Sequence, residues 1–398
     1  MATLYRKAAF VAVGLSNFTQ QAFHKRQQHF TDNLTQQDMS GRAMAVTGAN
    51  SGIGLEAARA FLLQNGHVHL ICRDRGRGEK ARDELMAEYS STHPSPPPSP
   101  LSSLPRVQLH LVDLSSVAQT KAFCRSFVRS NQPLHVLVNN AGCMVHKRTL
   151  TSEGLELNFA TNVATTFAIT EELLPVLRRC NTADYVSRVI TVSSGGMLTQ
   201  DVELDDLQSE KAAEGDATYI YAQNKRQQVV LTEAWQQREA ASATPAAPCV
   251  LFHAMHPGWA DTPGVQVSMG DFYHQMKGKW RTAAEGADTI SYLASAPSMS
   301  RWDGSGGVEA MKGGEFWLDR EVVSKTLPLG RYKRVGDDKV RHELVRRIKA
   351  IVDGVEPTEA DVQRYAYLVS DTAARNDNGN ATQSTATEVP VATEDVSR

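Results

Sequence analysis

Short apolar runs alternate with longer stretches of helical periodicity between Arg42 and about Leu318. Most of the runs are continuously apolar, which is typical of strands buried on both faces of a parallel sheet. The stretches between them, such as Leu55–Gln64 before Gly66, have the period of a helix and a glycine where a helix ends. This alternation predicts an α/β fold with a doubly wound parallel sheet and helices on both faces. The seven predicted strands are Ala43–Thr47, Val68–Cys72, Val107–Val112, Leu134–Val138, Val189–Val192, Val250–Ala254 and Glu315–Leu318.

The first 38 residues precede this pattern and form a basic helical segment of their own. Residues 1–30 carry four basic side chains and no acidic one, and their apolar residues recur at spacings of four and three. Three interpretations are open: a helix docked on the main domain, a helix in peripheral contact with a membrane, and a cleaved organelle presequence. The apolar stripe consists of Leu4, Ala8, Val11, Leu15, Phe18 and Ala22.

The main domain spans residues 39–330 and is followed by two further segments. Within it, residues 90–105 are rich in Pro and Ser and cannot supply a core, which predicts a disordered surface insert. Residues 331–371 form a helical extension, and residues 372–398 lack aromatic residues and apolar periodicity, as expected of a disordered tail. The extension contains one amphipathic stripe, made of Val340, Leu344, Ile348 and Val352.

Composition narrows the class of protein. The formal net charge is −2, so no strong field attracts nucleic acid. No apolar stretch reaches the ~20 residues that a membrane-spanning helix needs. The five cysteines are scattered, without a CxxC motif or histidines at metal-ligand spacing, which indicates reduced thiols and no metal site. We expect a cytoplasmic enzyme or binding protein, with membrane contact or organelle import left open by residues 1–30.

A glycine-rich turn joins the first predicted strand to the helix after it. It reads Thr47-Gly48-Ala49-Asn50-Ser51-Gly52-Ile53-Gly54. Glycines at such a turn permit the sharp bend, the approach of the backbone to a pyrophosphate, and close helix–strand packing. The helix N-terminus then offers free N–H donors to the phosphates. The turn therefore predicts a dinucleotide site formed by Gly48, Asn50, Ser51, Gly52, Ile53 and Gly54.

The TGxxxGxG spacing of this turn resembles the short-chain dehydrogenase/reductase family, and the resemblance covers Arg42–Leu318. It implies a Rossmann-like sheet of seven strands. Further motifs follow the third, fourth and sixth predicted strands in the family's order. By the resemblance, the first contacts the adenine, the second borders the cofactor, and the third leads to a threonine that bonds the nicotinamide carboxamide. The residues so implied in cofactor binding are Asp113, Leu114, Asn140, Ala141, Gly142, Pro257, Gly258 and Thr262.

Tyr221 and Lys225 stand four residues apart, on one face of a predicted helix. A tyrosine has a pKa near ~10, and a nearby cation lowers it, which would make Tyr221 a usable acid for reduction and base for oxidation. The resemblance implies that Lys225 also bonds the nicotinamide ribose. The pair alone is a weak signal, because a surface Tyr–Lys pair has the same spacing.

Two more candidates complete the predicted catalytic set. Ser194 ends the fifth predicted strand, where ligands sit in this architecture, and the resemblance implies that it bonds the substrate oxygen. Asn162 aligns with a helix asparagine of the family whose backbone carbonyl holds a proton-relay water. Asn158, one turn earlier, competes with it for this role.

These residues predict an oxidoreductase that moves a hydride between NADP(H) and a carbonyl or secondary alcohol. Arg73 follows the second predicted strand, where a guanidinium can clamp the extra phosphate of NADP. Asp74 is the alternative, because a carboxylate at the ribose would favour NAD(H). An alternative from another class of function is a cofactor-binding regulatory or scaffold protein with little turnover.

The substrate is predicted to be a small and hydrophobic molecule. Four large side chains lie between Asp261 and Thr282, where they either cover the substrate or pack this segment onto the domain. The resemblance also leaves open a homodimer through the helices that carry Asn162 and Tyr221. The four side chains are Phe272, Tyr273, Met276 and Trp280.

Overall fold

One eight-stranded sheet, in the order β3-β2-β1-β4-β5-β6-β7-β8, forms the centre of a computed structural model of the chain. The structure describes residues 2–182, 184–213, 216–243, 249–296, 299, 313–328 and 332–369. The first seven strands pair in parallel, and the last is antiparallel to its neighbour. The strands are β1 (Ala43–Thr47), β2 (His67–Cys72), β3 (Val107–Leu111), β4 (Val136–Asn139), β5 (Arg188–Val192), β6 (Leu251–Met255), β7 (Phe316–Leu318) and β8 (Glu321–Val322).

The predicted α/β class is confirmed, and the predicted number of strands is one too low. β8 returns from β7 through Asp319 and Arg320, whose φ angles of 51° and 64° match a two-residue hairpin turn. A two-residue strand after such a turn leaves no periodicity in the sequence, which is why the pattern shows only seven runs. Every residue of β1, β2, β4, β5 and β6 is buried, as their mostly apolar sequences predict.

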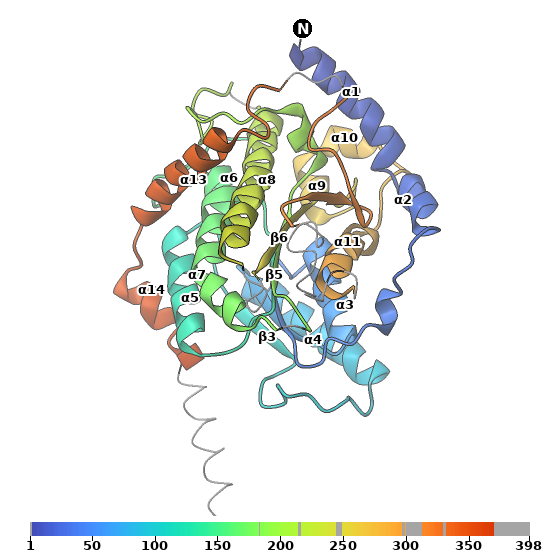
Figure 1. The fold of residues 1–398 in the computed structure, drawn as a ribbon, viewed down its shortest axis with the longest axis vertical. Helices are drawn as coiled ribbons and strands as arrows, with labels where there is room; N and C mark the ends of the chain where they lie inside the picture. Colours follow the sequence, from blue (N-terminus) through green and yellow to red (C-terminus); the bar gives the residue numbers. More distant parts are fainter. Residues whose placement is uncertain are drawn as a thin grey trace, which may run out of the picture.

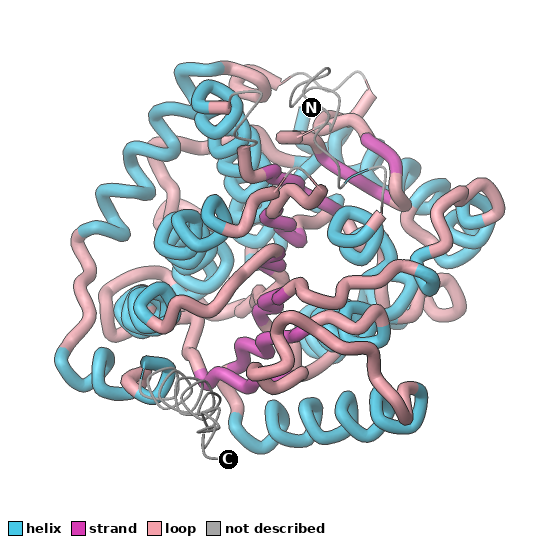
Figure 2. Tube along the Cα trace, turned by 60° about the horizontal axis from the view of Figure 1, so that its bottom comes forward, coloured by secondary structure: helices cyan, strands magenta, loops and turns pink. Residues whose placement is uncertain are grey.

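Helices cover both faces of the sheet (Figures 1 and 2). One core cluster joins α5, α7, α8 and α13 to the sheet, a second joins α3, α4 and α11, and a third contains Phe18 and Met276. The helices are α1 (Ala2–Asn17), α2 (Gln20–Gln27), α3 (Gly52–Leu63), α4 (Arg75–Thr92), α5 (Val117–Arg129), α6 (Leu157–Phe159), α7 (Thr165–Arg179), α8 (Ala217–Ser242), α9 (Pro263–Ser268), α10 (Gly270–Gln275), α11 (Ala283–Ser295), α13 (Asp338–Asp353) and α14 (Glu359–Arg364). Short helical turns are η1 (Leu34–Gln36), η2 (Ala160–Ala164, a π-helical turn) and η3 (Gly195–Thr199).

The Pro/Ser-rich segment 90–105 is more closely packed than its composition predicts. Its first three residues extend α4 to Thr92. Ser99 is buried, and its hydroxyl lies 3.1 Å from Nε2 of His67 in β2. The backbone oxygen of Pro97 accepts a hydrogen bond from Arg106 at 3.2 Å. The segment therefore supplies a polar partner to a buried histidine of the sheet, a role that amino-acid composition alone does not reveal.

The C-terminal extension belongs to the main core. The buried residues of α13 are the four residues of the predicted stripe, and they join the cluster formed by α5, α7 and α8. Lys121 of α5 donates from Nζ to the backbone oxygens of Val352 at 2.8 Å and Val355 at 2.6 Å. Tyr365 and Leu368 are buried as well. The predicted tail, residues 372–398, lies outside the described residues.

The two N-terminal helices dock on the α/β domain beside α10 and α11 (Figure 1). Phe18 and Phe23 are buried, and the backbone oxygen of Phe18 accepts a hydrogen bond from the amide of Trp259 at 2.8 Å. The predicted stripe is divided between two faces, because Val11 and Leu15 point outward with 49% and 45% exposure while Phe18 points inward. The side chain of Leu4 lies outside the described residues.

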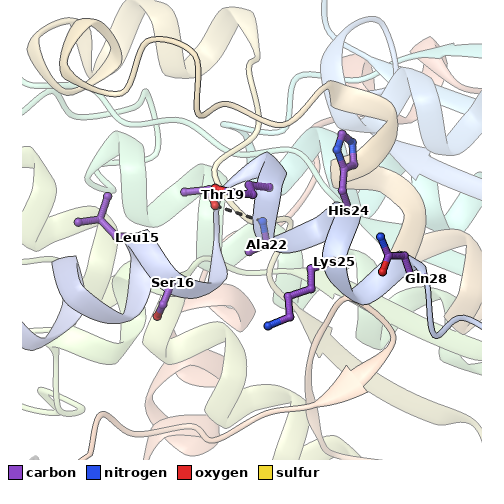
Figure 3. Close-up of a pocket in the computed structure, with 8 residues that line it drawn as sticks. Leu15, Ser16, Thr19, Ala22, His24, Lys25 and Gln28 are labelled. Atoms are coloured by element: carbon purple, nitrogen blue, oxygen red, sulfur yellow. Dashed lines mark hydrogen bonds between the residues drawn. The ribbon is translucent and has the colours of Figure 1, made fainter.

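α1 and α2 meet at a bend whose outer surface is hollowed. Thr19 caps α2 by accepting a hydrogen bond from the amide of Ala22 at 3.3 Å. Figure 3 shows Leu15 of α1 and Lys25 of α2 projecting from either side of this bend. Among the described helices, none is both long and apolar enough to pass through a membrane.

Candidate active site

The glycine-rich turn lies between β1 and α3, where the sequence places it. Gly48 and Gly52 have φ angles of 65° and 55°, which glycine adopts without strain. Ser51 precedes the first turn of α3 but makes no capping hydrogen bond with its side chain. The Ser51 side chain therefore leaves the first N–H groups of α3 uncapped. A helix N-terminus needs such free N–H groups to bind a phosphate.

Three segments far apart in the sequence meet at this turn. A Cβ atom at Gly54 would lie 2.5 Å from the backbone oxygen of Gly48 and would also collide with the Asn140 amide. A Cβ atom at Gly52 would lie 3.2 Å from the methyl group of Thr262. Gly54 therefore allows α3 to pack directly against the turn, and Gly52 allows Thr262 to lie close to it.

The loop after β4 is held against the turn by Thr47. The Thr47 hydroxyl accepts hydrogen bonds from the amides of Asn140 and Ala141, both at 2.9 Å. The Asn140 side chain donates to the backbone oxygen of Thr47 at 2.9 Å. Asn139 instead points into the core, where its side chain donates to Thr170 of α7 at 3.0 Å. These contacts place Ala141 and Gly142 between the glycine-rich turn and the catalytic candidates.

The remaining cofactor candidates lie on neighbouring loops. Asp113 follows β3 and accepts from the amide and hydroxyl of Ser115 at 3.0 and 2.8 Å, and Leu114 is buried beside it. Thr262 caps α9. Gly258 has a φ of 73° and lies directly against the Arg281 guanidinium, which also donates to the oxygen of Pro257 at 3.5 Å.

Arg73 and Asp74, which compete in the sequence, have different surroundings in the structure. Asp74 is the N-cap of α4 and accepts a hydrogen bond from the amide of Arg77 at 2.8 Å. This backbone hydrogen bond lowers the pKa of Asp74. Arg73 is exposed after β2, and it makes no hydrogen bond or ion pair within the part of the chain that the structure describes. Of these two residues, only Asp74 is therefore hydrogen-bonded to α4.

The phenol of Tyr221 lies close to the Ser194 hydroxyl. The Ser194 hydroxyl accepts from the amide of Gly196 at 3.2 Å, which fixes it at the start of η3. Burial raises the pKa of Tyr221 to about 12, and the nearby Ser194 hydroxyl offsets this only in part. The expected lowering of this pKa by Lys225 is not found, because burial of the phenol outweighs other influences.

Lys225 points away from the phenol oxygen. Its ammonium group donates to the backbone oxygen of Val192 at 2.8 Å and to Oε1 of Gln228 at 3.1 Å, and lies 5.4 Å from the centre of the Tyr221 ring. Burial lowers the pKa of Lys225 to about 8. A Cβ atom at Gly142 would lie 3.5 Å from this ammonium group, so Lys225 borders the predicted cofactor site.

Asn162 lies in the π-helical turn η2 and holds the loop after β4. Its side-chain oxygen accepts from the amide of Cys143 at 2.9 Å, and its side-chain nitrogen donates to the oxygen of Cys143 at 2.9 Å. The competing Asn158 makes the corresponding pair of bonds to Val145, at 2.7 and 3.2 Å. Asn162 is the one of the two that also bonds the catalytic helix, through Asn224 at 3.1 Å.

Gln228 is a site residue that sequence reasoning missed. Its side-chain nitrogen donates to the backbone oxygen of Asn162 at 2.6 Å, while its side-chain oxygen accepts from Lys225. The carbonyl that the family resemblance assigns to a relay water is thus bonded by an amide. Gln228 is fully buried and stands three residues after Lys225, on the same face of α8. That spacing is the sequence signal that could have revealed it.

The segment between Asp261 and Thr282 packs on itself and on the N-terminal helices. Trp259 contacts Phe272 with ring centres 5.2 Å apart, and Tyr273 stacks on Trp280 at 5.1 Å. Met276 is buried in a cluster that includes Phe18. These contacts account for all four large side chains as packing residues. Within the described residues, no three His, Cys, Asp or Glu side chains are placed to hold a metal ion.

Comparisons with known proteins agree with this geometry. A family model described as short chain dehydrogenase matches residues 42–203. The chain is 41% identical over 351 residues to dehydrogenase/reductase SDR family member 12 of Bos taurus, covering 87% of this chain and 99% of that protein. It is 29% identical over 272 residues to retinol dehydrogenase 14 of Homo sapiens, covering 66% and 76% of the two chains. An uncharacterized protein from Mycobacterium Paratuberculosis shares the fold, with a TM-score of 0.57, 23% identity, and coverage of 83% of this chain and 100% of that one.

Proposed function

This chain belongs to the short-chain dehydrogenase/reductase family, and on that premise we propose that it reduces the carbonyl group of a small hydrophobic molecule with NADPH. Membership of this family means that the chain is an oxidoreductase for CH–OH or C=O groups that uses NAD(P)(H). The observation that carries the proposal is the position of Tyr221 beside Ser194, next to Lys225 and Gly142.

The residues around the glycine-rich turn fit a dinucleotide. The uncapped N-terminus of α3 and the glycine-rich turn would hold its phosphates, and Gly142 with Lys225 would border its reactive end. When bound, the nicotinamide supplies the hydride. Ser194 would orient the substrate oxygen by a hydrogen bond, and Tyr221 would donate a proton to that oxygen as it gains negative charge.

The protonation state of Tyr221 is compatible with its proposed role as the proton donor in reduction. A phenol whose pKa is raised to about 12 is protonated at neutral pH, so it is ready to act as an acid. Alcohol oxidation needs the phenolate, which burial disfavours. Loss of NADPH absorbance across a panel of aldehydes, ketones, quinones and retinoids tests this function. Turnover of none of them would favour the alternative of a cofactor-binding protein with little activity.

Arg73 supports the choice of NADPH over NADH. Its guanidinium is exposed and uncommitted among the described residues, whereas the neighbouring Asp74 carboxylate already caps α4. A guanidinium can bond a phosphate through two parallel hydrogen bonds. The capping bond occupies one oxygen of the Asp74 carboxylate, which leaves fewer acceptor sites for the ribose hydroxyls of NADH.

We expect the Arg73→Ala variant to lose most of the preference for NADPH. A charge-assisted hydrogen bond contributes roughly 1.5–3 kcal/mol, so NADPH affinity should fall by about 10-fold or more while NADH affinity changes little. Isothermal titration with both dinucleotides measures this. Arg82→Ala, on the helix α4 that follows Arg73 and ion-paired with Asp83, is the control for net charge. Equal affinities in the wild type, or an unchanged preference in Arg73→Ala, would remove Arg73 from the site.

We also infer that Gln228 is a positioning residue that acts through Lys225. In a Gln228→Glu variant, a carboxylate would stand beside the ammonium group and favour its charged form. The pKa of Lys225, which burial lowers to about 8, should then rise by roughly one unit or more. The basic limb of the kcat/KM profile should move to higher pH with it.

The control for this experiment is Gln237→Glu, the same change at an exposed position of α8. Its pH profile should overlay that of the wild type. A purely structural role of Gln228 predicts a lower rate with an unshifted profile, and that result would contradict the inference.

Contact of residues 1–30 with a membrane stays a prediction. The residues available for it are Val11 and Leu15 on the outer face of α1, together with Lys25 of α2 (Figure 3). A homodimer through the helices that carry Asn162 and Tyr221 likewise stays a prediction.

A further inference from the structure

A cavity of about 530 Å³ lies beneath the N-terminal helix α1. Its volume falls in the range of roughly 300–1,000 Å³ that is usual for small-molecule sites. Its walls come from α1, η3, the residue that follows β6, the strand β7 and the segment 323–328. The larger apolar side chains in these walls are Val13, Phe18, Leu198, Phe316, Leu318 and Leu327.

His256 is the polar residue of this lining whose side chain is left without a partner within the described part of the chain; the other polar residues that line the cavity are Asn17, Arg26, Ser324 and Thr326. His256 is only 3% exposed, and neither ring nitrogen has a hydrogen-bond partner among the described residues. The aromatic edge contact with Phe18, at 4.3 Å between ring centres, gives the ring packing but no hydrogen bond. A buried polar group without a partner costs free energy, so a ligand that brings a hydroxyl or carbonyl group to His256 would be favoured.

The charges around the cavity argue for a neutral ligand. Burial, together with the nearby Arg281, holds the pKa of His256 well below its usual range, so its ring stays neutral and cannot balance an anion. Arg26 is the charged residue among those that line the cavity. Its guanidinium already donates to Asp319 at 2.6 Å and to the backbone oxygen of Asn17 at 3.0 Å. A carboxylate would therefore find its most obvious partner already engaged.

The cavity shares one wall with the active site but is separate from it. A Cβ atom at Gly195, which directly follows Ser194, would lie 2.8 Å from both Nε2 of His256 and the ring of Phe18. The pair Phe18 and His256 thus closes the space behind Ser194. None of the lining residues is a predicted catalytic or cofactor residue.

We propose that this cavity binds a neutral amphiphile, a molecule with an apolar chain or ring and a single hydroxyl or carbonyl group that bonds His256. The apolar part would lie between α1 and β7. Such a ligand would fix α1 against η3 and so stabilise the segment that carries Ser194.

The test is isothermal titration of the full chain without dinucleotide, using decan-1-ol and decanoate as probes of equal chain length. Decan-1-ol should bind one molecule per chain, at least about tenfold more tightly than decanoate. Val13→Trp, which fills the cavity, should weaken decan-1-ol binding at least tenfold. Val11→Trp, on the outward face of the same helix, should leave it unchanged. His256→Phe should weaken it about three- to tenfold, the scale of one lost hydrogen bond.

Four results would overturn the proposal: no binding of decan-1-ol, equal or tighter binding of decanoate, full binding by Val13→Trp, or displacement of decan-1-ol by saturating NADPH. The last would place the alcohol in the hydride-transfer site instead. Val323→Trp at the partly exposed mouth of the cavity gives a second blocked variant should Val13→Trp fail to fold. Because the readout is binding without cofactor, it does not depend on the proposed reductase activity.

Discussion

Turnover by a Tyr221→Phe variant should fall at least about a hundredfold, the usual scale for loss of a general acid. The substitution removes the phenol oxygen and preserves the ring, so α8 should keep its packing. The oxygen it removes is the one that lies beside the Ser194 hydroxyl. NADPH affinity, measured by isothermal titration, should stay within a few-fold of the wild type, because the glycine-rich turn and Lys225 are untouched.

Tyr219→Phe is the matched control for this variant. It removes a phenol oxygen from the same helix two residues earlier, at a position that is only partly buried. Its turnover should stay close to that of the wild type. If Tyr221→Phe retained a rate within a few-fold of the wild type, another group would have to supply the proton, and the assignment of Tyr221 would be wrong.

The strands could be predicted where burial on both faces of the sheet makes their sequences apolar. β1, β2 and β6 are buried along their whole length, so their sequences are mostly apolar and easy to recognise. β8 could not be found this way, because a two-residue edge strand with exposed residues has no pattern to detect. The orientation of α1 was also undetermined, since apolar residues occupy both its inner and its outer face.

In the candidate site, too, the residues that could be predicted are those that a local sequence pattern reveals. Tyr221, Lys225 and Ser194 follow from local spacing, and the structure brings them together. The role of Gln228 depends on a backbone oxygen in η2, sixty-six residues away in the sequence, and no local pattern contains such a contact. The pKa of Tyr221 was expected to fall because of a cation, but it rises because of burial, a property of the assembled fold.

The largest stability effect is expected at Asp319, a buried carboxylate between two arginines. It accepts from Arg281 at 2.5 and 2.9 Å and from Arg26 of α2 at 2.6 Å. The side chains of Arg281 and Asp319 are only 1% and 2% exposed. The triad connects the end of β7 with the N-terminal helices and with the loop that carries Gly258, so three segments depend on one carboxylate.

Asp319→Asn should lower the free energy of unfolding by about 3–5 kcal/mol, because it leaves a buried guanidinium without its counter-charge. Asparagine tolerates the positive φ of 51° at this position, so the loss reports on charge more than on backbone strain. Urea unfolding measures the effect, with Asp353→Asn as the control. That residue pairs with Lys349 at an exposed site, where such a change costs about 1 kcal/mol or less. Since Arg26 loses the same partner, limited proteolysis should also cut faster next to α2. A loss no larger than that of the control, with unchanged proteolysis, would show that Arg281 does not need Asp319 to remain buried.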